Sequence, residues 1–338
     1  MVTDTPRRQP TLDEVAARAG VSRAAVSRVV NNAPYVSAAK RQAIERAIRD
    51  LGYVPNRAAR ALATQRNGNV VLAVSLADPA VFGDPFFAQI IAGVSEALEE
   101  TELHLLICLA ASARGEARLK NLLSTQGVDG IMPLSVRGEG DPLIQIVESS
   151  GLPAVYCGRP LDREPRWYVD ADNYGGTRAA VEHLIERGRT RIATIAGPPG
   201  FRNTQTRNRA FHDALAIAGL TPYGAVESDF TEPGGARAMR ALLEQYPTLD
   251  AVFVANDNMA LGALATLREL GRRVPADVAV VGFDDVRPAA ITDPPLTTVR
   301  QSIESLGRET ARMLAQVLQG GQPSPVILPT TLVRRASA

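Results

Sequence analysis

Arg23 and Arg28 lie in a short segment whose side chains could read the edges of base pairs. A guanidinium can donate hydrogen bonds to both acceptors of one guanine edge, which is worth ~1–3 kcal/mol of discrimination. Ala24 lies four residues before Arg28 and would share its face of a helix, where its methyl group could contact a thymine. Ser27 completes the exposed set. The alternative is an ordinary helical hairpin whose arginines are merely solvated.

Local signals place these side chains at the start of the second of two short helices. Thr11 and Glu14 form a T-x-x-E capping box that begins the first helix. Gly20 can end that helix in the left-handed conformation, and Ser22 can cap the second helix. The second helix has an apolar stripe of Ala25, Val26, Val29 and Val30. Two short helices divided by a glycine turn predict a helix-turn-helix, which puts the start of its second helix in the major groove.

A third helix and the charge distribution extend this prediction. Ser37 would cap a helix that runs to about Leu51 and ends at Gly52, and its apolar residues would close a three-helix core. Residues 1–66 carry a net charge of +7, whereas the remainder carries −6. A basic head on an acidic body indicates that the head binds a polyanion. Beyond the head, the alanine-rich stretch after Asn56 is too short to be a stable helix alone in water.

The head resembles that of the lac repressor (LacI/GalR) family in the runs VSRAAVSRVVN (residues 21–31), GYVPNR (52–57) and ALA (61–63), and the resemblance continues to the last residues. It implies that residues 56–63 form a hinge helix that pairs with a second subunit in the minor groove. Leu62 would then wedge open a base step, unless it is simply buried in a core. The expected DNA-binding residues are Ser22, Arg23, Ala24, Ser27, Arg28, Asn31, Tyr35, Asn56, Arg57 and Leu62.

From Val70 onward, short apolar runs alternate with helical stretches, which predicts parallel sheets covered on both faces. The resemblance sharpens this to an α/β two-lobed fold like that of periplasmic binding proteins, joined to the all-α head. We expect a DNA-binding domain at 1–52, a hinge helix and linker at 53–67, and an effector-binding and dimerisation domain at 68–338. Lobe 1 would comprise about 68–165 and 297–325, and lobe 2 about 166–296 and 326–338.

Polar and aromatic residues follow several of the predicted strands, where ligands bind in such sheets. The resemblance implies that Arg207, Asn256 and Asp284 hydrogen-bond an effector and that Phe230, with Phe86 or Phe87, stacks on it. That set suits a sugar. Phe87 could instead be core, and Arg207 a surface ion pair. Residues 201–204 depart from sugar-binding patterns and are similar to those of the purine-sensing branch, so a nucleobase or nucleoside effector stays open.

Other classes of function find little support. The three histidines have no serine or cysteine partner at nucleophile-like positions, so no enzyme activity, cofactor or metal is expected. Cys108 and Cys157 lie in apolar runs and are expected to be buried free thiols. No apolar run reaches ~18 residues and no secretory leader is evident, which favours a cytoplasmic protein. A sugar-binding protein without regulatory DNA binding is the less favoured alternative.

The expected mechanism is that of a homodimer on a near-palindromic operator in double-stranded DNA. A small effector, most simply a carbohydrate, would fit one closure angle of the lobes and change the spacing of the two hinge helices. The default is a repressor released by its ligand. A purine- or nucleoside-responsive, corepressed regulator of the same family is the alternative, with the same physics and the opposite sign.

Overall fold

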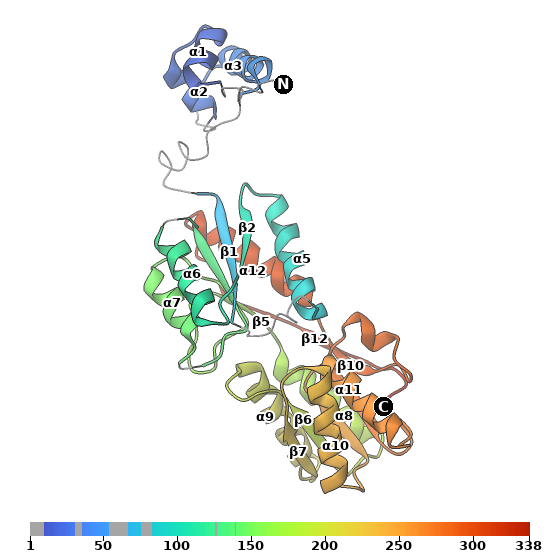
Figure 1. The fold of residues 1–338 in the computed structure, drawn as a ribbon. Helices are drawn as coiled ribbons and strands as arrows, with labels where there is room; N and C mark the ends of the chain where they lie inside the picture. The colour runs from blue at the N-terminus through green and yellow to red at the C-terminus, as the bar shows by residue number, and fades with distance from the viewer. Residues whose placement is uncertain (1–9, 31–35, 54–66, 76–82, 126, 139) are drawn as a thin grey trace, which may run out of the picture. The chain divides into compact units, whose positions relative to one another are not determined.

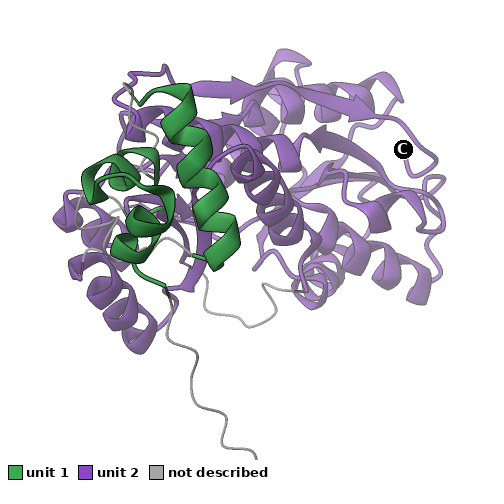
Figure 2. Cartoon of the chain, turned by 90° about the horizontal axis from the view of Figure 1, so that it is seen from above, with its two compact units in different colours: residues 1–68 green, residues 69–338 purple. Residues whose placement is uncertain are grey.

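The computed structural model describes residues 10–30, 36–53, 67–75, 83–125, 127–138 and 140–338. The chain forms two compact units, residues 1–68 and 69–338 (Figure 2), and each is considered by itself. Among the described helices, none is long and apolar enough to cross a membrane.

The head consists of α1 (Leu12–Ala19), α2 (Arg23–Val30) and α3 (Ala38–Leu51). The predicted capping box is confirmed: the Thr11 backbone N–H donates to Glu14 Oε2 at 2.7 Å, and the Glu14 N–H donates to Thr11 Oγ1 at 3.3 Å. Gly20 ends α1 with a φ of 65°, as predicted. Ser37 precedes α3, but its side chain makes no capping hydrogen bond.

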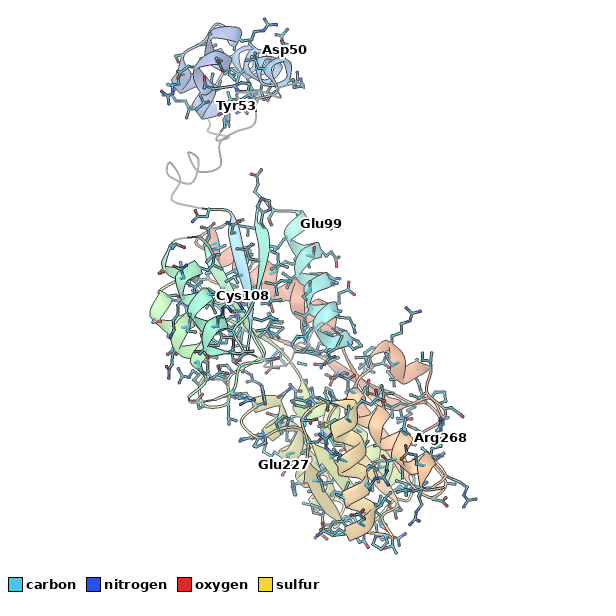
Figure 3. The ribbon with its side chains drawn as sticks, viewed as in Figure 1. Asp50, Tyr53, Glu99, Cys108, Glu227 and Arg268 are labelled. Atoms are coloured by element: carbon cyan, nitrogen blue, oxygen red, sulfur yellow. The ribbon has the colours of Figure 1, made fainter. Side chains whose placement is uncertain are left out.

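The three helices of the head enclose a small apolar core. Val15, Val26 and Ile44, one from each helix, are fully buried, and Tyr53 packs beside them after the end of α3 (Figure 3). Because the apolar side chains of α2 face this core, its charged side chains are left on the outer face. The sequence pattern therefore dictates which residues of α2 remain available to a partner.

The body contains two six-stranded sheets (Figure 1). The first has the order β11-β5-β4-β3-β1-β2 and the second β12-β10-β9-β8-β6-β7. Every pairing is parallel except that of β12 with β10. The strands of the first sheet are β1 (Asn69–Val74), β2 (His104–Leu109), β3 (Gly130–Leu134), β4 (Tyr156–Cys157), β5 (Tyr168–Ala171) and β11 (Val326–Leu328). Those of the second are β6 (Ile192–Ala196), β7 (Gly224–Glu227), β8 (Ala251–Val254), β9 (Ala279–Asp284), β10 (Thr297–Gln301) and β12 (Thr330–Val333).

Each sheet is covered by helices on both faces, which buries its central strands completely, whereas the strands at the edges stay partly exposed. Helices α5 (Pro85–Glu99) and α12 (Ile303–Leu318) cover one face of the first sheet, and α6 (Ala113–Ser124) and α7 (Pro142–Ser150) cover the other. Helices α10 (Glu232–Gln245) and α11 (Asp257–Glu269) cover one face of the second sheet. Helices α8 (Asn173–Glu186) and α9 (Arg202–Ile217) cover the other. The short 3-10 helix η2 (Arg287–Ala290) follows β9.

One helix pair in each lobe is interlocked through glycine. A Cβ atom on Gly93 of α5 would lie 1.9 Å from the Glu304 backbone oxygen of α12. In the other lobe, a Cβ on Gly262 of α11 would lie 2.0 Å from the Glu232 backbone oxygen at the start of α10. Backbone this close leaves no room for a side chain, so each pair packs as a stiff unit.

The sheet membership of the strands places the lobe boundaries differently from the sequence prediction. Residues 168–171 and 326–328 pair within the first sheet, whereas they were expected in lobe 2. Residues 297–301 pair within the second sheet, whereas they were expected in lobe 1. The apolar pattern of such short strands does not tell which sheet recruits them, because backbone pairing is decided by the three-dimensional neighbours.

The chain passes between the lobes three times, and each passage is a single residue between two elements: Asp172, Ser302 and Pro329. Two of the passages are bonded to each other. The Asp172 N–H donates to the Leu328 carbonyl at 2.8 Å, and Thr330 Oγ1 donates to the Asp172 carbonyl at 3.0 Å. The connection between the lobes is therefore short, and hydrogen bonds link two of its three segments.

The two cysteines are free thiols in different environments. Cys157 is buried at the end of β4, and burial raises its pKa to about 12. Cys108 is only half-buried, contrary to the prediction, because it lies on β2, the edge strand of its sheet (Figure 3).

Candidate functional site

A cavity lies between the two lobes, at the carboxyl ends of several strands. The empty space within it, part of which is open solvent, is about 880 Å³. All six effector residues expected from the sequence line it: Phe86, Phe87, Arg207, Phe230, Asn256 and Asp284. They come from both lobes and from positions nearly 200 residues apart. The structure thus brings the whole set to one place.

Asp284 is a buried carboxyl group at the end of β9. Gln301 Nε2 donates to its Oδ1 at 2.6 Å, and Arg207 Nη2 lies 3.7 Å from the same oxygen. Burial raises the pKa of Asp284 to about 7, and the Arg207 charge opposes that rise. A carboxylate with spare lone pairs in a desolvated cavity is a strong acceptor for ligand hydroxyl groups.

Arg207 is buried, so it is not the surface ion pair considered as an alternative. Only 4% of it is exposed, and its guanidinium lies over the Phe283 ring at 3.5 Å from the centroid. Its Nε donates to Asn173 Oδ1 at 2.8 Å, and its Nη1 donates to the Ala255 carbonyl. Burial lowers the pKa of Arg207. The side chain is fixed in orientation, which presents its remaining N–H groups to the cavity.

Asn256 fixes the position of Phe230. Its Oδ1 accepts from the Met259 N–H at 3.0 Å and caps α11, and its Nδ2 donates to the Phe230 carbonyl at 3.1 Å. Phe230 meets Phe201 edge to face at a centroid distance of 6.0 Å. A Cβ on Gly197 would lie 2.3 Å from the Phe230 ring, so glycine is what admits the ring there.

Phe86 and Phe87 begin α5 behind its cap, Asp84, whose Oδ1 accepts the Phe86 N–H at 2.9 Å. Their rings are perpendicular, with centroids 5.3 Å apart. Phe87 belongs to the apolar core of lobe 1 and also lines the cavity, whereas Phe86 is less buried and packs against that core. Phe87 is therefore both a core residue of lobe 1 and part of the cavity wall.

Three non-glycine residues that line the cavity have a positive φ: Ser135 at 56°, Phe230 at 65° and Asp284 at 111°. Such conformations cost of order 1–3 kcal/mol each for most residues and persist where surrounding structure over-determines them. The cavity wall is thus held in shape at an energetic cost.

Several further cavity residues were not singled out from the sequence: Arg159, Asp170, Asn173 and Gln301. Arg159 Nε donates to Asp170 Oδ2 at 2.8 Å, and Asn173 Nδ2 donates to Asp170 Oδ1 at 3.2 Å. Asp170 lies on β5, a strand of four residues that has no apolar run because it includes this carboxylate. The sequence therefore did not reveal the strand, and a polar residue near a strand end would have been the only sign of a cavity residue here.

The outer face of α2 carries the residues expected to read DNA. Arg23, Ala24 and Arg28 are exposed, and Ser27 is half-buried. The Ser22 Oγ accepts from the Ala25 N–H at 3.3 Å, which supports its capping role. Arg23 lies 3.7 Å from Asp13, and both side chains are 68% exposed, so this weak pair leaves the guanidinium available. The other expected DNA contacts lie outside the described residues: Asn31, Tyr35, Asn56, Arg57 and Leu62.

In the described part of the chain, no group of three or more histidine, cysteine or acidic residues is arranged to hold a metal ion. Three carboxylates and three arginines line the cavity, and the arginines are engaged by protein groups.

A basic three-helix head and a two-lobed α/β body with a cavity between its lobes define a DNA-binding regulator with a small-molecule site. Residues 11–56 match the family of bacterial regulatory proteins of the lacI type, and residues 181–338 match a periplasmic binding protein-like domain. The chain is 47% identical to the HTH-type transcriptional regulator CelR of Thermobifida fusca, covering 98% of this chain and 99% of that one. It is 32% identical to the lactose operon repressor of Escherichia coli K12, covering 96% and 89%.

Solved structures agree. A transcriptional regulator CelR–cellobiose complex superposes with a TM-score of 0.77 at 44% identity, covering 98% of this chain and all of the other. A lac repressor dimer bound to operator and the anti-inducer ONPF gives a TM-score of 0.83 at 31% identity, covering 98% and 99%. The chain belongs to the lacI family and is a DNA-binding transcriptional regulator.

Proposed function

We propose that the protein is a homodimeric repressor released from a near-palindromic operator when a carbohydrate binds between its lobes. The observation that carries the proposal is the interlobe cavity, into which polar and aromatic side chains from both lobes converge. A ligand that contacts both walls stabilises one closure angle. It can change operator affinity only by its differential affinity for the two lobe arrangements, typically ~1–3 kcal/mol.

The chemistry of the cavity favours a carbohydrate. Asp284 and Arg207 offer an acceptor and donors for hydroxyl groups, and the Phe230 ring offers an apolar surface for sugar C–H groups. The related CelR is described in complex with cellobiose, which supports a neutral saccharide of that kind. A purine or nucleoside is the second candidate, favoured by the Phe201–Phe230 ring pair, which could stack on a base.

An exposed edge strand supports the dimer. Strand β2 is at the edge of its sheet, and its Ile107 is 41% exposed. An exposed apolar edge strand offers a template for pairing with another chain. We propose that a second copy covers it, which sedimentation of the purified protein would test.

A ligand panel tests the proposed effector class. Cellobiose, glucose, sugar phosphates, adenosine and guanine are each added to the full chain, and thermal unfolding is measured. The true class should stabilise the protein by ~2.7 kcal/mol at 100 times its dissociation constant. The same ligand should release the protein from an operator selected from random DNA. If only purines stabilise the protein, the proposed effector class changes from carbohydrate to purine. If no operator can be selected from random DNA, the proposed repressor function is wrong.

Arg28→Ala is expected to reduce discrimination against altered operator bases by ~1–3 kcal/mol at one position of each half-site, because an exposed arginine on α2 can contact a base edge. Effector binding should not change. Competition binding against single-base operator variants measures the effect. Arg49→Ala, on the exposed face of α3, is the control and should leave the base preference intact. Unaltered discrimination in Arg28→Ala would remove it from the reading set.

A further inference from the structure

A loop of lobe 1 is hydrogen-bonded to the first turn of a lobe 2 helix beside the cavity. The loop connects β4 to β5, and the helix is α9, which begins at the side of lobe 2 nearest lobe 1 (Figure 1). Arg202 Nε donates to the Pro160 carbonyl at 2.8 Å, and its Nη2 donates to the Arg163 carbonyl at 3.3 Å. Its Nη1 lies 3.4 Å from Glu164 Oε1. We call Arg202, Glu164 and these two carbonyl groups the interlobe clasp.

The clasp is continuous with the wall of the cavity. Glu164 Oε1 also accepts from Arg159 Nη1 at 3.2 Å, and Arg159 is held by Asp170. Beside the clasp, Arg137 of lobe 1 lies over the Phe201 ring of lobe 2, 5.3 Å from its centroid. Arg202 itself lines the cavity, whereas Glu164 does not.

These contacts join the lobes independently of the three chain passages at Asp172, Ser302 and Pro329. Any rotation about those passages that parts the lobes at α9 must break the bonds of Arg202. Its side chain is only 23% exposed, and a charged donor on backbone carbonyls makes stronger bonds than a neutral one. Glu164 is 56% exposed, so its own pair with Arg202 is worth less.

We infer that the interlobe clasp holds the lobes closed, and that Arg202 and Glu164 thereby set effector affinity as positioning residues. The inference rests on the proposed binding of an effector between the lobes. The apparent dissociation constant of a ligand that needs closed lobes is its intrinsic value divided by the closed fraction. Weakening the clasp lowers that fraction, so affinity falls even for a substitution that never touches the ligand.

The test compares two variants with one matched control. Glu164→Gln removes the charge outside the cavity and should weaken cellobiose binding by roughly threefold, and Arg202→Leu by about tenfold. Glu96→Gln is the control: Glu96 pairs with Arg308 within lobe 1, away from the clasp, and is 52% exposed, close to Glu164. It should leave affinity unchanged. Isothermal titration gives the affinities.

A second measurement needs no effector. Spin labels at Ala113 on α6 and Ala241 on α10, both exposed, report the distance between the lobes in a Cys108→Ser background of the full chain. Glu164→Gln and Arg202→Leu should add a longer distance to the distribution, and Glu96→Gln should not. The combined variant should be less than additive.

The outcomes separate the two proposals. If distances lengthen but no carbohydrate binds the unaltered protein, the effector assignment fails and the clasp stands. If the distances do not change in either variant, the clasp is overturned, whatever happens to affinity. A loss of affinity in Glu164→Gln without a longer distance likewise overturns it, because the residue would then act by a local contact.

Discussion

Asp284→Asn is expected to weaken effector binding by at least about 100-fold while operator binding stays intact. Two ligand hydroxyls on one buried carboxylate make charge-assisted hydrogen bonds worth ~1.5–3 kcal/mol each, and the amide retains only part of that. Asparagine tolerates a φ of 111° better than alanine does, so the turn after β9 should survive. Titration calorimetry gives the affinity, and operator release at rising effector concentration gives the response.

The control for this experiment is Asp293→Asn, in the same lobe. The Asp293 side chain is 98% exposed and lies 3.9 Å from Arg268, so its loss should change neither affinity nor response. Wild-type affinity in Asp284→Asn would remove that residue from the effector site.

Arg207→Met is expected to destabilise the lobes by about 3 kcal/mol, and by more at alkaline than at acidic pH. Removing one partner of a buried ion pair typically costs 3–5 kcal/mol, because the other charge is left unpaired. Here the unpaired group, Asp284, can take up a proton, which reduces the cost at low pH. The hydrogen bonds to Asn173 and the Ala255 carbonyl are lost at every pH.

The sign of the pH dependence follows from the raised pKa of Asp284, about 7 in the folded protein against an ordinary 3.8. Below about pH 4 the group is protonated in both states and contributes nothing. As the pH rises toward 7 the unfolded state releases the proton first, so stability falls, and above 7 the penalty is constant. Without Arg207 the pKa rises further, and the penalty keeps growing above pH 7.

Urea unfolding at pH 5.5 and pH 8.5 measures this difference. Arg268→Met, whose side chain is 67% exposed, provides the reference for losing a surface guanidinium. An equal loss of stability at both pH values in Arg207→Met would show that Asp284 does not respond to the arginine.

The head was predictable from its sequence almost residue by residue, because its signals are local. The Thr11–Glu14 capping box and Gly20 act within one turn of the helix they delimit, and both are observed in the predicted form. The apolar stripe of α2 fixed which arginines are exposed. Ser37 was less informative, since its position before α3 is right but its hydroxyl group does not cap.

In the body, strands with an unbroken apolar run, such as β8, were predictable, and strands without one, such as β10, were not. Strand β5 has four residues, and β11 and β12 are divided by Pro329 alone, so their sheet membership depends on tertiary neighbours. Because β5 was not predicted, Asp170 on this strand and Asn173 just after it were not predicted as cavity residues. The family pattern identified Arg207, Asn256 and Asp284 as cavity residues, but the positive φ at Phe230 and Asp284 had no sequence signal.

The three one-residue passages have a mechanical consequence. Separate tethers, two of them cross-braced by hydrogen bonds at Asp172, resist twisting and sliding far better than a lone flexible joint does. We therefore expect any relative motion of the lobes to be close to a rotation about a single axis through these passages. If the proposed effector binds between the lobes of a dimer, we expect it to change the angle between them, and thereby the spacing of the two DNA-binding heads, rather than to loosen the structure.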